Sequence, residues 1–165
     1  IDRAGVRLRR AGVHNVQRRL LANERDPWVK RHAGTFDRVL IDAPCTGSGT
    51  GRRNPDQRWR LAPDSLAALA AEQAAILDSA ARLVRPGGRL VYATCSLFRA
   101  ENEAQAEAFV ARNAGFALLP VPSVWAAALP GPCPADGPML MLTPARHGTD
   151  GFFVAVLERE AATRA

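Results

Sequence analysis

Long apolar runs are missing from this sequence of 165 residues. No run approaches the roughly 18 residues that a membrane-spanning helix needs, so the sequence predicts no membrane partner. Residues 1–5 lack the pattern of a signal peptide and give no indication of secretion. We therefore expect a cytoplasmic protein whose length suits one domain with a sizeable core.

Cysteine and histidine are both scarce, with three residues of each type. Cys45, Cys95 and Cys133 lie far apart, and an odd number of cysteines without a secretory signal argues against a disulfide framework. No CxxC pair and no histidine cluster has the spacing of metal ligands. The sequence therefore predicts neither disulfide bonds nor a bound metal.

Lysine is almost absent as well. The net charge is +6 and Lys30 is the only lysine, so arginine carries nearly all the positive charge. Arginine matches phosphate geometry and stacks on bases, which suits an anionic partner such as nucleic acid. A compositional habit explains the charge equally well, because the chain is also rich in alanine. The oligomeric state is not predicted.

Apolar runs alternate with segments of helical spacing along the chain. The Gly87-Gly88 pair is expected to end the longest helix, as glycine commonly does. Expected helices cover residues 3–12, 64 to the glycine pair, and 101–113. Expected strands cover residues 16–21, 36–42, 89–94, 116–119, 139–142 and 152–157, and the last two can pair as a hairpin. Residues 43–63 and 120–138 are expected to be irregular.

This alternation predicts an α/β sheet with parallel strands, whose ligands lie beyond the carboxyl ends of the strands. Residues 42–45 end one predicted strand, and residues 94–96 end the next. If the two strands are neighbours, Cys45 and Cys95 face one crevice.

The segment Asp42-Ala43-Pro44-Cys45-Thr46-Gly47-Ser48-Gly49 is open to several interpretations. Its glycine spacing differs from GxGxxG, and the Gly-Lys-Ser/Thr of a phosphate loop is absent. A cysteine-phosphatase cradle would need arginine at the position of Gly51. Cys45 and Cys95 could each be a buried, inert thiol, but their positions after consecutive strands favour a functional role.

Three longer segments carry a family resemblance. FDRVLIDAPCTGSGTGRRNPDQRW, PGGRLVYATCSLFRAENE and DGFFVAVLER resemble signatures of the Sun/Nop family of RNA cytosine-C5 methyltransferases. The resemblance covers nearly the whole chain. It implies a Rossmann-like class I methyltransferase sheet, mostly parallel with an antiparallel closing strand. It also implies that residues 1–165 form the C-terminal part of one catalytic domain.

The resemblance assigns roles to three residues. It implies that Cys95 attacks C6 of cytosine, that Cys45 assists release of the covalent adduct, and that Asp42 hydrogen-bonds the base near N3 and N4. DNA cytosine methyltransferases use a Pro-Cys nucleophile on the corresponding loop, so Cys45 is the alternative nucleophile by that analogy. The Thr94-Cys95 pair favours the RNA family.

The family uses S-adenosylmethionine as its cofactor. The resemblance implies that Asp42 and Pro44 contact this cofactor, with Asn23 or Asp26 near its adenine. The family's Pro-Gly-Gly-Lys cofactor loop and the acidic residue after its second strand are not found here. We therefore expect this polypeptide alone to bind the cofactor poorly.

The family's partner is RNA, and ribosomal RNA is favoured over transfer RNA. The basic loop at 52–60 suggests that Arg52, Arg53 and Arg58 contact RNA, whereas Trp59 is expected to be a packing anchor. The alternatives are a catalytically inactive RNA-binding or assembly fragment and, less favoured, an α/β domain that acts on another small molecule.

Overall fold

The computed structural model describes residues 2–56, 59, 62 and 64–161. Its centre is a five-stranded sheet of order β1-β2-β5-β3, in which β4 also pairs with β5. The strands are β1 (Phe36–Asp42), β2 (Val84–Thr94), β3 (Phe116–Leu119), β4 (Leu140–Leu142) and β5 (Phe152–Arg159).

Strand directions confirm the predicted α/β fold. β1 and β2 are parallel, and β5 is antiparallel to β2, β3 and β4. Four strands therefore run one way and β5 runs the other, as expected for a closing strand. β1 lies at the edge of the sheet, where Leu40 is 71% exposed.

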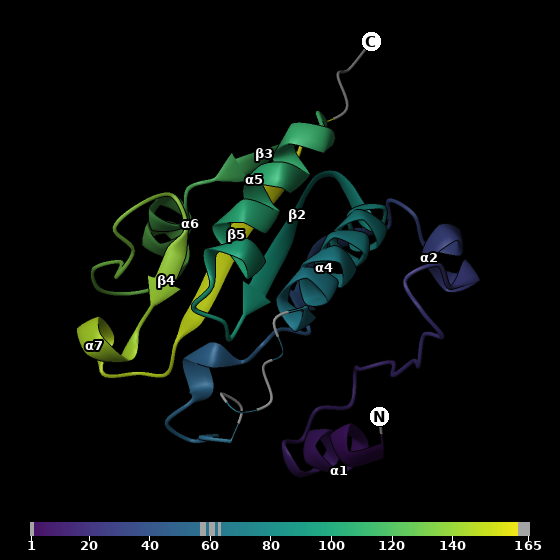
Figure 1. The fold of residues 1–165 in the computed structure, drawn as a ribbon. Helices are drawn as coiled ribbons and strands as arrows, with labels where there is room; N and C mark the ends of the chain where they lie inside the picture. The colour runs from purple at the N-terminus through teal and green to yellow at the C-terminus, as the bar shows by residue number, and fades with distance from the viewer. Residues whose placement is uncertain (1, 57–58, 60–61, 63, 162–165) are drawn as a thin grey trace.

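Helices lie on both faces of this sheet. The described helices are α1 (Asp2–Arg10), α2 (Pro27–Arg31), α4 (Ser65–Ala81), α5 (Glu103–Arg112), α6 (Val121–Ala128) and α7 (Pro144–His147), with 3₁₀ turns η1 (Ser48–Thr50) and η2 (Arg99–Glu101). Of these, α4 and α5 pack on one face of the sheet and α6 on the other. Figure 1 shows α4 and α5 crossing the front of the sheet and α1 lying apart from it. None of the helices in the described ranges is long and apolar enough to cross a membrane.

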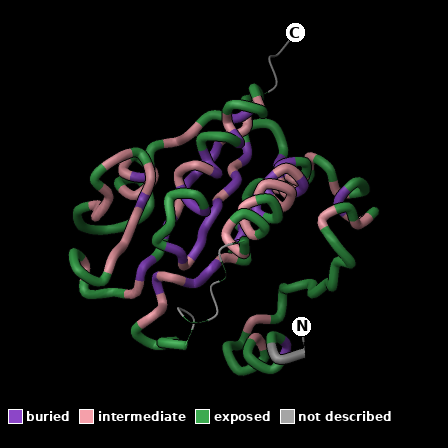
Figure 2. Tube along the Cα trace, viewed as in Figure 1, coloured by how far each residue is buried: buried purple, intermediate pink, exposed green. Residues whose placement is uncertain are grey.

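The core has two layers because successive strand residues point to opposite faces. On β2, Leu90 and Tyr92 pack against α4 and α5, whereas Val91 faces the cluster around α6. Figure 2 shows the buried residues concentrated along the central strands and the inner faces of α4 and α5. The large buried core therefore lies between the sheet and these two helices, directly below the loops that carry the cysteines.

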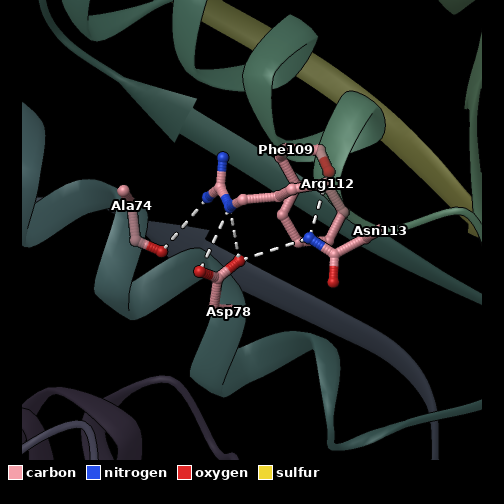
Figure 3. Close-up of polar contacts among 5 residues, drawn as sticks. All are labelled: Ala74, Asp78, Phe109, Arg112 and Asn113. Atoms are coloured by element: carbon pink, nitrogen blue, oxygen red, sulfur yellow. Dashed lines mark hydrogen bonds and ion pairs between the residues drawn. The ribbon is translucent and has the colours of Figure 1, made fainter.

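A polar contact joins α4 to α5 at their exposed ends (Figure 3). Arg112 Nε donates to both carboxylate oxygens of Asp78, at 3.0 and 3.2 Å, and Asn113 Nδ2 donates to one of them at 3.3 Å. The Arg112 guanidinium also lies 5.5 Å from the centre of the Phe109 ring. Partly exposed ion pairs contribute at most about 1 kcal/mol, so this contact aligns the helices more than it stabilises them.

The strand predicted at residues 16–21 is wrong. Within the described part of the chain this segment pairs with no strand, and Leu20 is 79% exposed. An apolar run becomes a strand only when a partner satisfies its backbone groups, and the segment does not reach the edge of β1.

The glycine pair 87–88 does not end a helix. α4 ends at Ala81, and the glycines lie within β2, where its register with β1 shifts. Gly87 adopts a positive φ of 72°, and a Cβ on Gly88 would lie 3.0 Å from the Asp37 carbonyl oxygen. The pair therefore forms a bulge that brings β2 close to β1.

Residues 120–138 also differ from the prediction, because they include α6. Pro122 lies in the first turn of this helix, where no backbone donor is required, and alanines follow. The remaining predicted elements are confirmed. The strands at 36–42 and 116–119 have the predicted bounds, the other elements have shifted ends, and β4 pairs with β5.

Gly49 joins the loop after β1 to the loop after β2 and to Gly151, which precedes β5. Gly49 N donates to the Cys95 carbonyl oxygen at 2.9 Å, and Gly151 N donates to the Gly49 carbonyl oxygen at 2.8 Å. A Cβ on Gly49 would lie 2.6 Å from the Gly151 oxygen and 2.8 Å from the Cys95 oxygen. Both obstacles are backbone atoms, so a larger residue would push the loops apart.

We therefore expect Gly49→Ala to destabilise the intact protein by about 1–3 kcal/mol, as overpacking usually does. The measurement is the free energy of unfolding from urea titration. Gly51→Ala is the matched control, because its Cβ would lie 3.7 Å from the nearest atom, the Ser48 oxygen. The control should stay within about 0.5 kcal/mol of the wild type. Equal stability of the two variants would contradict the close packing.

Candidate active site

The two cysteine loops meet at one edge of the sheet. Asp42, the last residue of β1, pairs with Ala93 of β2, so Cys45 and Cys95 both follow the carboxyl ends of neighbouring strands. Their sulfur atoms lie 3.5 Å apart, with either thiol able to donate. Both residues are partly buried. This geometry confirms that the two cysteines lie side by side at the carboxyl ends of neighbouring strands.

Electrostatics at the site favour a protonated thiol on Cys95. Burial raises the pKa of Cys95 to about 11, and the hydrogen bond and charge of Cys45 and then the charge of Asp42 act in the same direction. Asp42 is exposed at the end of β1, and the charge of its carboxylate acts on the Cys95 thiol. For Cys95 to act as a nucleophile, either a base must remove its proton or substrate binding must lower its pKa.

Beneath the thiols, the carboxylate of Glu101 is fully buried. Its Oε1 accepts from Thr46 N at 2.9 Å and from Gln73 Nε2 at 3.1 Å. Its Oε2 accepts from Thr46 Oγ1 at 2.6 Å and from Ser96 Oγ. Thr46 and Ser96 directly follow the two cysteines, so a single carboxylate contacts both loops.

A second set of hydrogen bonds fixes the backbone around Cys95. Thr94 Oγ1 donates to Asn102 Oδ1 at 2.5 Å, and Asn102 Nδ2 donates to the Ser96 carbonyl oxygen at 2.9 Å. Ser96 N donates to Thr94 Oγ1 at 3.1 Å. The turn that carries Cys95 is therefore closed by side chains on either side of it.

The arginines predicted to contact RNA are near the same edge. Asp150, which precedes β5, forms an ion pair with Arg53 and a longer one, of 3.8 Å, with Arg52. Both arginine side chains are mostly exposed, whereas that of Asp150 is only 14% exposed. Arg58 lies outside the described residues. Trp59 is 84% exposed, so the expectation that it anchors packing is wrong.

The residues predicted to contact the cofactor fall into two groups. Asp42 and Pro44 lie beside the cysteines at the end of β1. Asn23 borders a hollow of about 560 Å³ that includes Val29 and Ile76. Asp26 caps α2: it accepts from Trp28 N at 2.8 Å and from Ala22 N at 3.1 Å, which lowers its pKa.

Sequence reasoning gave no role to Glu101, Asn102, Gln73 or Asp150. The Glu-Asn-Glu run at 101–103 after the second cysteine was the available signal for the first two. Gln73 occupies an apolar helical position on α4, and that mismatch was also visible. Asp150 required knowledge of the fold. Among the described residues, no group of three or more His, Cys, Asp or Glu side chains could hold a metal ion.

Comparisons with known proteins identify relatives of this chain. The chain is 39% identical to a probable ribosomal RNA small subunit methyltransferase B of Synechocystis sp., over 96% of this chain and 36% of the relative. The crystal structure of PH0851 superposes with a TM-score of 0.83 at 38% identity, covering 96% of this chain and 34% of that one.

A further solved structure, NSun6 from Pyrococcus horikoshii with SFG, has a TM-score of 0.74 at 26% identity and covers 96% of this chain and 38% of that one. The chain thus spans little more than a third of the length of these relatives. The family model of the 16S rRNA methyltransferases RsmB/F matches residues 2–158. With its two cysteine loops and mixed sheet, this chain belongs to the RsmB/F family, within the Sun/Nop group that its sequence resembles.

Proposed function

We propose that the intact protein transfers a methyl group to C5 of a cytosine in ribosomal RNA. The observation that carries this proposal is the placement of two thiols 3.5 Å apart after neighbouring parallel strands. The carboxylate of Asp42 ends the first of these strands. Membership of an RNA methyltransferase family supports the reaction class.

Two thiols suit the chemistry of an unreactive carbon. Cytosine C5 is a weak nucleophile, and a thiolate that adds to C6 makes it enamine-like and reactive. In this proposal the Cys95 sulfur forms a bond to C6 and C5 then accepts the methyl group. Loss of the C5 proton expels the sulfur and restores the ring. Cys45, in contact with Cys95, assists this last step.

Asp42 has a distinct part in the proposal. Its carboxylate is an acceptor for the N4 amino group and for a proton at N3, which withdraws electrons from the ring and favours addition at C6. The same carboxylate contributes to the high pKa of Cys95. A hydrogen bond from the cytosine base to the Asp42 carboxylate, or neutralisation of that carboxylate, would therefore lower the pKa of the Cys95 thiol when the substrate binds.

The residues present fit S-adenosylmethionine in part. The negative charge of Asp42 suits the positively charged sulfonium, and the mainly aliphatic hollow beside Asn23 has the size of a small-molecule site. Asp42 and Pro44 would hold the cofactor, which supplies an electrophilic methyl group. Asn23 is a separate candidate, because the hollow that it borders is lined by neither of these residues. Asp26 is the weaker candidate, because both of its oxygens already accept backbone hydrogen bonds. The relative solved with SFG, an analogue of this cofactor, supports the assignment.

RNA is the proposed macromolecular partner, with ribosomal RNA favoured by the similarity to small-subunit methyltransferases. We accordingly place the protein in the cytoplasm. Bisulfite mapping of RNA treated with the intact protein tests the base, the position and the class of RNA. Methylation confined to transfer RNA would show that transfer RNA, and not ribosomal RNA, is the substrate. Methylation of a base other than cytosine would overturn the proposed chemistry.

Substitutions of the two cysteines should affect methyl transfer in different ways. Cys95→Ala removes the nucleophile and should abolish methyl transfer. Cys45→Ala should permit attack but slow release, so that a covalent protein–RNA adduct accumulates. Denaturing gel electrophoresis with labelled RNA and cofactor detects the adduct. Its accumulation in Cys95→Ala instead would reverse the two roles.

Reactivity of Cys95 should depend steeply on pH. Because its pKa is about 11, its thiolate fraction should increase about tenfold for each pH unit between 7 and 10. The rate of iodoacetamide labelling of Cys95, followed by peptide mass spectrometry, measures this fraction. Asp42→Asn removes a charge that raises the pKa, so its profile should move to lower pH. If the pH profile of Asp42→Asn is the same as that of the wild type, Asp42 does not affect the pKa of Cys95.

Arg52 and Arg53, which pair with Asp150, should act through phosphate contacts. Replacing Arg52 and Arg53 with Gln should weaken RNA binding and reduce the slope of log affinity against log salt by about one to two. Fluorescence anisotropy across a salt series measures both. Arg85→Gln is the control, because Arg85 lies near the opposite end of β2 and pairs with Asp37. Equal losses in the two proteins would indicate a general charge effect.

A further inference from the structure

We infer that Glu101 is a positioning residue that sets the separation of the two thiols. Its carboxylate binds the residue after each cysteine: Thr46 through both its backbone N–H and its hydroxyl, and Ser96 through its hydroxyl. This inference rests on the proposed function, in which Cys45 acts on the adduct formed by Cys95. It adds a residue to which neither the sequence motifs nor that chemistry gave a role.

The placement of Glu101 is itself fixed. The Tyr92 hydroxyl, buried on β2, donates to the Glu101 carbonyl oxygen at 2.6 Å. On the other side, Gln73 of α4 donates to the carboxylate at 3.1 Å and to the Pro44 carbonyl oxygen at 2.9 Å. The carboxylate is therefore held by the sheet and by α4 before it contacts either cysteine loop.

A buried carboxylate is an unusual side chain if its only role is to hold the two cysteine loops together. Its removal from water is unfavourable, and an apolar side chain of similar size would fill the space without that cost. Four donors from three separate segments offset the cost here. Oxygen acceptors also have directional geometry, which an apolar contact lacks. A buried carboxylate can therefore fix the relative position of two loops more narrowly than packing can.

The consequence for the thiols follows from their place in the chain. Cys45 lies between Pro44, held by Gln73, and Thr46, held by Glu101. Cys95 lies between the end of β2 and Ser96, held by the same carboxylate. Each cysteine is thus joined by one peptide bond to a residue that Glu101 fixes. The hydrogen bonds described for the Glu101 carboxylate involve neither sulfur.

The test is Glu101→Gln in the intact protein, with Glu103→Gln as the matched control from the same Glu-Asn-Glu run. Glutamine keeps the shape but provides one oxygen acceptor instead of two. We expect kcat to decrease about 100-fold, as small misplacements of reacting groups do, while the RNA KM stays within about threefold. The control should match the wild type in both constants.

A second readout needs neither RNA nor cofactor. Diamide takes two electrons and two protons from a pair of thiols, leaving a Cys45–Cys95 disulfide and the reduced hydrazine. Because a disulfide requires specific geometry, cross-linking should be about tenfold slower in Glu101→Gln than in the wild type. Peptide mass spectrometry follows the rate, and thermal melting shows that the variant remains folded.

Ser96→Ala is the second variant if Glu101→Gln does not fold, because it removes the hydroxyl that joins the Cys95 loop to the carboxylate. It also removes the contacts of this hydroxyl with Ser48 Oγ and Phe98 N. It too should slow cross-linking and lower kcat with little change in KM. Unchanged cross-linking in a folded variant would overturn the inference, as would an unchanged kcat in a protein that methylates RNA. If cross-linking slows but the wild type methylates no RNA, the positioning role stands and the proposed function fails.

Discussion

Backbone hydrogen bonding between β1 and β2 brings the chemistry of this protein together. The two strands are parallel and in register up to Asp42 and Ala93, so their following loops leave the sheet at the same edge. The cysteines are separated by 50 positions in sequence but their sulfurs by only 3.5 Å. Without this pairing neither thiol would have a partner, and the buried hydrogen bonds below them would have nothing to connect.

The site is supported by polar contacts where most of the core is apolar. The residues Tyr92, Glu101, Asn102, Thr94 and Ser96 are all fully buried, next to the apolar core under α4 and α5. Such groups are tolerated inside a protein when their donors and acceptors are matched. The matching here involves several separate segments, so the carboxyl-end loops are fixed by the fold as a whole and not by their own sequence.

The sequence predicted the parts that depend on local pattern. The apolar runs at 36–42 and 89–94 are strands, and the positions of Cys45 and Cys95 follow from where those runs end. The run at 16–21 failed because a strand also needs a partner, which no local pattern supplies. The glycines at 87–88 were misassigned because the same dipeptide suits a helix end and a sheet bulge. The role of Glu101 was not predicted, because its hydrogen-bond partners Thr46 and Gln73 are remote in sequence.

The edge position of β1 has a practical consequence. Its outer side is not paired within the described residues, and Leu40 on this strand is largely exposed. An uncovered strand with an apolar side chain is a template onto which another extended chain can add. Anyone who prepares this polypeptide by itself should therefore plan for self-association through this edge and choose dilute conditions, with light scattering as a routine check before any measurement.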